Sequence, residues 1–326
     1  MSEVQNKGIE LVLGAGGVKG FGHVGVLKAI EELDIPIRSV VGVSVGSLVA
    51  ALYANGFNSD QIYAEMKRGL SQRNDPALIM QTLTPADPIS LAVGGPIDLT
   101  RPMRDMVERL KLTPKPKLKV VSCDLLRHEP VLFEGESYDL AKALTASCAL
   151  PTVLRPVWHQ DGATPRLLVD GAIYHYNPTD FCEDGAIVST FRPASEIPRD
   201  FESPFQALMR LVTAVFQGPV DAVATCMQVI TEMVRDLENP FDIYFHLREM
   251  YAPLAGHRRY VDPHKNVVLE IGLRDSAGLS FGIGNERADE MVKDGYETAK
   301  KILSQAIKEG RVPTRKSPEP ADEQIV

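Results

Sequence analysis

The chain has 326 residues, of which 44% are hydrophobic and 24% charged, and its formal net charge is -8. Its apolar content is enough to bury a full core, and its length suits one large domain or two small ones. An acidic chain without a basic stripe lacks the charge that binding to a phosphate backbone requires, so nucleic acid is excluded as an expected partner.

The distribution of apolar residues and cysteines indicates a cytoplasmic protein. Residues 1–8 lack the basic-then-apolar run of a secretory signal, and charges interrupt the longest apolar stretch after Pro204. We therefore expect no export signal and no transmembrane helix. The four cysteines lie far apart without a C-x-x-C pair, which suits a reducing compartment and predicts neither a zinc site nor a dense disulfide framework.

The first 56 residues predict strand, glycine loop and helix, followed by a second strand and helix. Residues 9–13 form an apolar run that ends in glycines, and apolar residues at helical spacing follow up to residue 34. Residues 39–43 predict a buried strand, and residues 48–54 a helix that Asn55 and Gly56 can end.

The same alternation continues, which is typical of a three-layer α/β/α fold with a largely parallel central sheet. Further strands are predicted at residues 118–123, 130–133, 166–169 and 186–190, and helices at residues 101–110 and 138–146.

Beyond Pro204 the pattern becomes mainly helical. A helical stretch over residues 205–237 precedes an apolar run at 266–271 and a closing helix at 286–307. We expect an α/β core over residues 8–205, a mainly helical part over 206–310 packed on that core, and a disordered tail over 311–326.

Gly42, Val43, Ser44, Val45 and Gly46 match the G-x-S-x-G nucleophile elbow. A buried strand precedes the motif and an apolar helix follows it, as the elbow requires. The two glycines leave room where strand and helix approach, so that the Ser44 hydroxyl can project at the start of the helix. The alternative, in which Ser44 only caps the helix, is less favoured because the motif and its context agree.

A glycine loop over residues 14–20 lies between the first strand and its helix. Clustered glycines let consecutive N–H groups converge on one point, which suits the oxyanion of an acyl-transfer intermediate. The expected donors are the N–H groups of Gly16, Gly17 and Val18. Residues 20–25 also spell G-x-G-x-x-G, but they lie at the helix instead of directly after the strand, so close helix packing is favoured over nucleotide binding.

A serine nucleophile needs a group that accepts its proton. The seven histidines have no distinctive sequence context, whereas Asp170 ends an apolar run and so lies at the tip of a predicted strand. The tripeptide Asp-Gly-Ala also occurs at Asp161 and Asp184, which we interpret as ordinary turns. Asp170 is therefore the predicted base.

Taken in order, these motifs resemble those of the patatin-like phospholipase family. The matching segments are the G-G-x-K-G loop with Lys19 and Gly20, the elbow, an A-S-x-A-x-P block at residues 146–151, and the D-G-A of Asp170 and Gly171. The resemblance covers residues 8 to 180 and implies a Ser-Asp dyad that acts on acyl esters of phospholipids, lysophospholipids or neutral lipids without metal or cofactor. Asp170 would accept the Ser44 proton and later activate water.

The chain departs from the family pattern after the aspartate, where relatives often carry asparagines. Here Tyr174, His175 and Tyr176 come first, and His175 is a candidate for an assisting role. Ala15 stands where many relatives have glycine, which matters little because Gly16 and Gly17 remain.

Two segments bear on access to lipid. A basic tract on this acidic chain could face anionic head groups in transient membrane contact or could simply be a solvated helix face and linker; it comprises Arg101, Arg104, Arg109, Lys111, Lys115, Lys117 and Lys119. Residues 78–99 are rich in proline and glycine and are a candidate for a mobile cover over the site.

Three other functions share part of this pattern. An α/β-hydrolase esterase would use a Ser-Asp-His triad with a late histidine such as His257 or His264, but its nucleophile usually follows several strands and Ser44 follows two. A malonyl-transferase-like enzyme usually has histidine where this chain has Val43. A non-catalytic lipid-binding or scaffold protein of the same fold would not need Ser44 and Asp170 to be intact.

Overall fold

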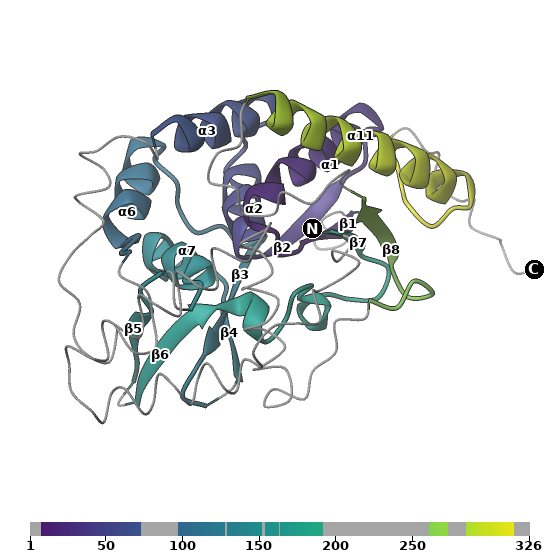
Figure 1. Ribbon diagram of the computed structural model, residues 1–326. Helices are drawn as coiled ribbons and strands as arrows, with labels where there is room; N and C mark the ends of the chain where they lie inside the picture. The colour runs from purple at the N-terminus through teal and green to yellow at the C-terminus, as the bar shows by residue number, and fades with distance from the viewer. Residues whose placement is uncertain are drawn as a thin grey trace, which may run out of the picture.

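The computed structural model describes seven segments of the chain (Figure 1). They are residues 8–72, 97–127, 129–151, 154–162, 164–191, 261–272 and 285–315. The helix predicted at 205–237, most of the predicted cover at 78–99, and the histidines His128, His246 and His257 lie outside these residues.

The predicted strand and helix pairs of the first 56 residues are confirmed. Strand β1 (Ile9–Leu13) is buried throughout, and α1 (Phe21–Glu32) follows it after a short 3-10 turn, η2 (Gly17–Gly20). Strand β2 (Ile37–Val43) leads into α2 (Val45–Ala54). The two strands are parallel neighbours, so the loops that follow them meet at one edge of the sheet.

Helix α3 (Ser59–Gln72) was not predicted, although the sequence carries a signal for it. Asn58 accepts a hydrogen bond from the Gln61 N–H and the Gln61 side chain accepts one from the Asn58 N–H, which is the reciprocal pattern of a capping box. Ile62 of this helix is fully buried and packs in the core that α1 and α2 also contact.

The eight-stranded central sheet has the order β5-β6-β3-β2-β1-β7-β8, with β4 paired to β3. Its centre is parallel, whereas β4 and β6 run antiparallel to β3, and β5 runs antiparallel to β6. The remaining strands and helices are β3 (Leu118–Asp124), β4 (Glu129–Phe133), β5 (Val157–Asp161), β6 (Thr164–Asp170), β7 (Ile187–Phe191), β8 (Val267–Ile271), α6 (Thr100–Arg109) and α7 (Leu140–Cys148).

Alternate residues of the central strands point to opposite faces of the sheet. Leu11 and Val40 lie in the main core, to which every described α-helix contributes side chains, whereas Val41 and Val43 lie in a smaller cluster on the other face. On that second face the structure describes two 3-10 turns, η3 (Gly171–Ile173) and η4 (Thr179–Phe181). The α/β fold with a central sheet is confirmed, and helices of a third layer are not among the described residues.

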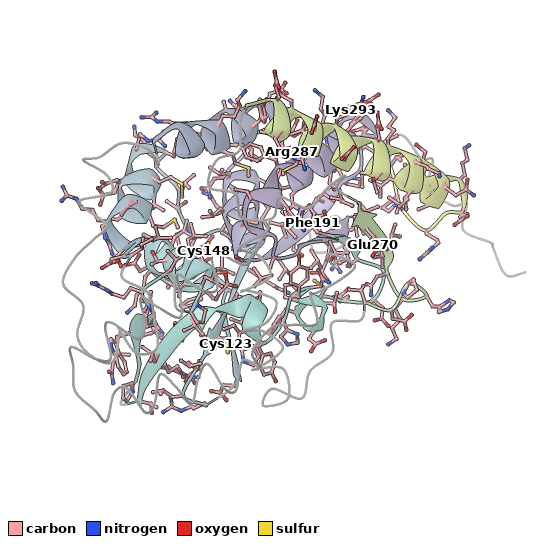
Figure 2. The ribbon with its side chains drawn as sticks, in the orientation of Figure 1. Cys123, Cys148, Phe191, Glu270, Arg287 and Lys293 are labelled. Atoms are coloured by element: carbon pink, nitrogen blue, oxygen red, sulfur yellow. The ribbon has the colours of Figure 1, made fainter. Side chains whose placement is uncertain are left out.

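The predicted closing helix is confirmed as α11 (Asn285–Lys308), which runs along α1 and directs polar side chains such as Lys293 outward (Figures 1 and 2). The folded part extends further than expected. Arg311 donates to the carbonyl oxygen of Asn266, and Val312 is buried against the core, so the predicted tail does not begin at Arg311. No described helix is long and apolar enough to cross a membrane.

The basic tract predicted from sequence does not form a single surface. Arg104 and Arg109 of α6 pair with carboxylates of neighbouring segments, and Lys119 of β3 donates to the carbonyl oxygen of Phe181 beneath the second face of the sheet. Its charges are therefore divided between different sides of the fold.

Glycine contacts hold α1 and α11 close together. A Cβ atom at Gly295 would collide with the backbone of Gly22, and one at Gly25 would collide with the backbone of α11. Backbone atoms cannot move aside as flexible side chains do, so we expect Gly295→Ala to lower the free energy of unfolding by about 1–3 kcal/mol in urea denaturation.

Gly69→Ala is the matched control, because Gly69 also lies in a helix but has open space around its Cβ position. It should stabilise the protein by about 0.5–1 kcal/mol through higher helix propensity. Equal effects of the two substitutions would contradict the close helix contact.

Candidate active site

The elbow places Ser44 in a strained turn between β2 and α2. Its backbone has φ 54° and ψ -132°, a conformation that costs a non-glycine residue about 1–3 kcal/mol. Gly46 is required beside it, because a Cβ atom there would collide with the carbonyl oxygen of Leu13 at the end of β1. A Cβ atom at Gly42 would lie 2.5 Å from the carbonyl oxygen of Gly46, so both glycines of the motif are needed for the turn to close.

The Ser44 hydroxyl donates a hydrogen bond to Oδ2 of Asp170 across a distance of 2.7 Å. The sheet register brings the two together: Val43 pairs with Val121, and the next residue of β3, Ser122, pairs with Asp170. Ser44 and Asp170 thus lie at one level on either side of β3. Asp170 ends β6, as predicted, although this strand runs antiparallel to β3.

Burial sets the electrostatics of Asp170, which is 2% exposed. Loss of hydration raises the pKa of its carboxyl group from 3.8 to about 7, although hydrogen bonds from the Ala172 N–H and the Ser44 hydroxyl act in the opposite direction. Gly171 allows this tight approach, because a Cβ atom there would lie 2.5 Å from the carbonyl oxygen of Val121. A carboxylate with a pKa near neutrality can both accept and return a proton at physiological pH.

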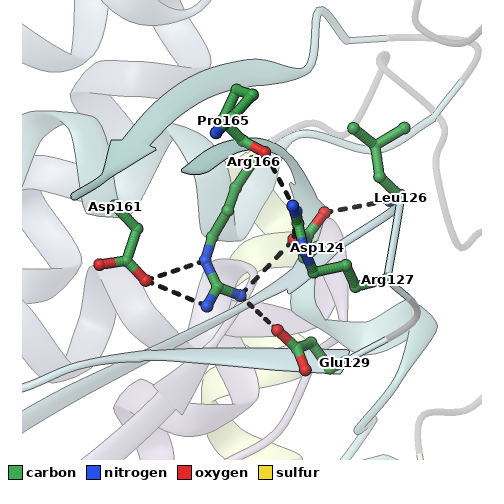
Figure 3. A network of polar contacts seen from close by, with 7 residues as sticks. All are labelled: Asp124, Leu126, Arg127, Glu129, Asp161, Pro165 and Arg166. Atoms are coloured by element: carbon green, nitrogen blue, oxygen red, sulfur yellow. Dashed lines mark hydrogen bonds and ion pairs between the residues drawn. The ribbon is translucent and has the colours of Figure 1, made fainter. Parts of the chain in front are cut away.

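Asp124, another buried carboxylate of the sheet, has a different environment (Figure 3). Its Oδ2 atom lies 2.8 Å from Arg127 and 3.5 Å from Arg166, and Arg166 also pairs with Glu129. These ion pairs tie β3, β4 and β6 together. Among the described residues no lysine or arginine pairs with Asp170, so of the two carboxylates Asp170 is the one suited to proton transfer.

The glycine loop lies against the elbow. Its first residue, Gly14, donates its N–H to the carbonyl oxygen of Ser189, and Ala15 donates to that of Tyr176. A Cβ atom at Gly20 would collide with the Val45 side chain, so the end of the loop directly touches the start of α2.

The expected oxyanion donors occupy the start of η2. The first N–H groups of a 3-10 turn have no partner within the turn, which leaves those of Gly16, Gly17 and Val18 outside its own hydrogen bonds. Gly17 has φ 53°, which favours glycine, and the buried Lys19 donates its backbone N–H to the Gly16 carbonyl oxygen. The loop can therefore present donors beside Ser44.

His23 of α1 supports this loop from behind, a role that the sequence did not indicate. Its Nε2 atom lies 2.8 Å from the carbonyl oxygen of Gly14, and its Nδ1 atom lies 2.8 Å from Oγ of Ser189. A carbonyl oxygen only accepts, so Nε2 carries the proton and Nδ1 accepts from the Ser189 hydroxyl. Burial lowers the pKa of His23 to about 4, which keeps the ring neutral and this pattern intact.

The packing interpretation of residues 20–25 is confirmed. Gly22 approaches the ring of Phe191, which lies beneath α1 (Figure 2), and Gly25 approaches α11. A Cβ atom at either position would collide with its neighbour, so these glycines are accounted for by close contact.

The His175 side chain contacts Asp180 and aromatic rings, and His264 lies far along the sheet. His175 Nε2 is 3.4 Å from Asp180 Oδ2, and its ring meets those of Tyr174 and Phe181 edge-on. His264 lies in the turn that precedes β8, at the far end of the sheet from β3.

The aspartates of the two other Asp-Gly-Ala tripeptides lie in a turn and at the end of an edge strand. Asp184 lies in a turn, as predicted, with Gly185 at φ 96°. The turn predicted around Asp161 begins later, because His159 and Gln160 belong to β5 and pair with β6. Within the described segments, no group of three or more His, Cys, Asp or Glu residues is placed to hold a metal ion.

Comparison with known proteins gives independent matches. A family model described as patatin-like phospholipase matches residues 11–182. An uncharacterised NTE family protein of Mycobacterium tuberculosis is 32% identical over 171 residues, which are 51% of this chain and 42% of that protein. Lysophospholipase NTE1 of Debaryomyces hansenii is 46% identical over 65 residues, which are 20% of this chain and 4% of that protein.

Among solved structures, VipD of Legionella pneumophila aligns over 92% of this chain and 67% of its own, with a TM-score of 0.43 and 15% identity. The residues matched to the two curated relatives make up less than half the length of each relative.

The raised pKa of Asp170 predicts a pH-dependent stability. The folded protein binds this proton more tightly than the unfolded chain, so the stabilisation is complete below pH 3.8 and is lost as the pH rises through about 7. Asp170→Asn removes this dependence. We expect urea denaturation to show that the free energy of unfolding of the wild type falls by on the order of 2 kcal/mol from about pH 5 to about pH 8, relative to that of Asp170→Asn.

Asp184→Asn, which removes an exposed carboxylate, is the control and should follow the wild type. If wild type and Asp170→Asn lose stability in parallel over this range, the buried carboxyl group is not the cause.

Proposed function

The chain belongs to the patatin-like phospholipase family, and we propose that it is a serine acyl hydrolase acting on lipid esters, with Ser44 as nucleophile and Asp170 as base. The observation that carries this proposal is the 2.7 Å hydrogen bond from the Ser44 hydroxyl to a buried carboxyl group, made from a strained elbow. A hydroxyl held in this way is placed to lose its proton as it attacks.

The reaction would proceed in two steps. Ser44 Oγ attacks the acyl carbon while Asp170 takes its proton, and the N–H groups of Gly16, Gly17 and Val18 stabilise the resulting oxyanion. The C–O bond to the alcohol then breaks, the proton passes from Asp170 to the departing oxygen, and an acyl ester remains on Ser44. Asp170 next takes a proton from a water molecule as the water oxygen attacks the acyl carbon of that ester. The bond from the acyl carbon to Ser44 Oγ then breaks, Asp170 returns the proton to Ser44 Oγ, and the fatty acid is released.

Phospholipids and lysophospholipids are the proposed substrates. The support is the matched family and the yeast lysophospholipase relatives, whose similarity extends over 65 residues. Such substrates reside in bilayers or micelles, so the protein would make transient contact with a lipid surface during turnover. The divided basic tract does not identify the contacting face.

The Ser-Asp-His alternative receives less support. His264 lies before β8, and two strands, β7 and β1, separate β8 from β2, which ends at the nucleophile. A non-catalytic role is also less favoured, because a scaffold has no need of a strained serine that is hydrogen-bonded to a buried carboxyl group.

Fatty-acid release from phosphatidylcholine and lysophosphatidylcholine tests the dyad. Ser44→Ala and Asp170→Asn should each lower kcat by roughly 10³-fold or more, because each removes a group that acts in both steps. His264→Ala is the control and should remain near wild type. Loss of activity in His264→Ala with retention in Asp170→Asn would support a triad instead.

The pH dependence of the reaction provides a second test. Only the ionised form of Asp170 can accept the proton, so kcat/KM should rise as the pH increases through about 7 and level off above it. A water-soluble nitrophenyl ester is a suitable substrate because the ester itself has no group that gains or loses a proton in this range. A rate that is independent of pH between about 5 and 8 would contradict Asp170 as the base.

A further inference from the structure

The turn that ends α7 contacts the backbone of the nucleophile. Ser147, the next-to-last residue of this helix, is fully buried. Its Oγ atom accepts a hydrogen bond from the Ser44 N–H at 2.9 Å and donates one to the carbonyl oxygen of Val121 at 2.6 Å. A single hydroxyl thus links α7, the central strand β3 and the elbow.

The same turn also holds the backbone of the base. The carbonyl oxygen of Ala149 accepts a hydrogen bond from the Asp170 N–H at 2.9 Å, and Ala149 is buried. Within three consecutive residues, therefore, one turn bonds to both members of the dyad. Neither contact involves the atoms that react.

The elbow needs such support, since a strained backbone persists only where its surroundings determine it. Serine hydroxyls hold Ser44 on both sides: Ser147 accepts from its N–H, and Ser47 donates to its carbonyl oxygen at 2.6 Å. Ser47 belongs to the helix that follows the elbow, whereas Ser147 comes from a separate element that also fixes Asp170. Of the two hydroxyls, that of Ser147 bonds to both the elbow and β3, the strand that lies between Ser44 and Asp170.

We propose that residues 146–149 form a brace that sets the distance between nucleophile and base, and that Ser147 is a positioning residue of the active site. The inference rests on the proposed dyad and assigns a role to the A-S-x-A segment that precedes the aspartate. Without the Ser147 hydroxyl, the Ser44 N–H and the Val121 carbonyl oxygen lose their shared partner, and the elbow can relax away from Asp170.

Thr145 offers a matched control on the same helix. It is buried, and its hydroxyl donates to the carbonyl oxygen of Ala141 within α7, away from the dyad. Thr145→Val therefore removes a buried hydroxyl hydrogen bond of α7, as Ser147→Ala does, but it leaves the contacts of Ser44 and Asp170 unchanged.

The test is covalent labelling of Ser44 by an alkyl fluorophosphonate, which requires an activated serine but no knowledge of the natural lipid. In Ser147→Ala the maximal labelling rate should fall roughly 10- to 100-fold, because a small misplacement of reacting groups has effects of this size. The probe concentration at half-maximal rate should change little. Thr145→Val should label within about 2-fold of wild type, and Ser147→Thr, which keeps the hydroxyl, should recover most of the rate.

Circular dichroism and thermal melting establish that each variant is folded. If Ser147→Ala does not fold, Ser147→Cys takes its place, because a thiol is a weak donor and acceptor of similar size, and it should also label slowly. A folded Ala or Cys variant that labels at the wild-type rate, or a Thr145→Val variant that is equally slow, would overturn the brace while leaving the dyad in place. A folded wild-type protein that does not label would overturn the dyad and the brace together.

Discussion

The hydrogen bond between Ser44 and Asp170 is the interaction that the other features of the site act together to form. It joins residues 126 positions apart in sequence, and it requires the strained elbow, the register of β2, β3 and β6, and the glycines that let backbones approach. The elbow carries backbone strain at Ser44, and the close approaches exclude a side chain at the glycines. Together they place a hydroxyl against a carboxyl group that burial has made unusually basic for an aspartate.

The two buried carboxylates of the sheet show why burial alone does not make a base. Asp124 pairs with two arginines, Arg127 and Arg166, and these ion pairs link β3, β4 and β6. Burial raises the pKa of Asp170 to about 7, and its two hydrogen-bond donors, which carry no charge, offset this loss of hydration only in part. Burial of the Asp170 carboxyl group lowers the stability of the fold at neutral pH, and the same burial gives a carboxylate that can both accept and return a proton.

The sequence was sufficient to predict the alternation of strands and helices in the core and to select Ser44 and Asp170 as candidates, because both sit at the ends of apolar runs with distinctive glycines. It was insufficient for β5, a polar edge strand in which Trp158 is 48% exposed and whose pairing with β6 is made by the backbone. The supporting roles of His23 and Ser147 were missed because each bonds to a partner far away in sequence, Ser189 for His23 and Ser44 for Ser147, and only the folded chain brings these residues together.

The central claim is that an acyl group passes through Ser44. The most direct measurement is rapid acid quenching of the wild-type protein during turnover of lysophosphatidylcholine, followed by peptide mass analysis. The account predicts a peptide containing Ser44 whose mass is increased by one acyl group, formed before fatty acid is released and absent from Ser44→Ala. Fatty-acid release without such an adduct in wild type, or an adduct on another residue that persists in Ser44→Ala, would contradict it.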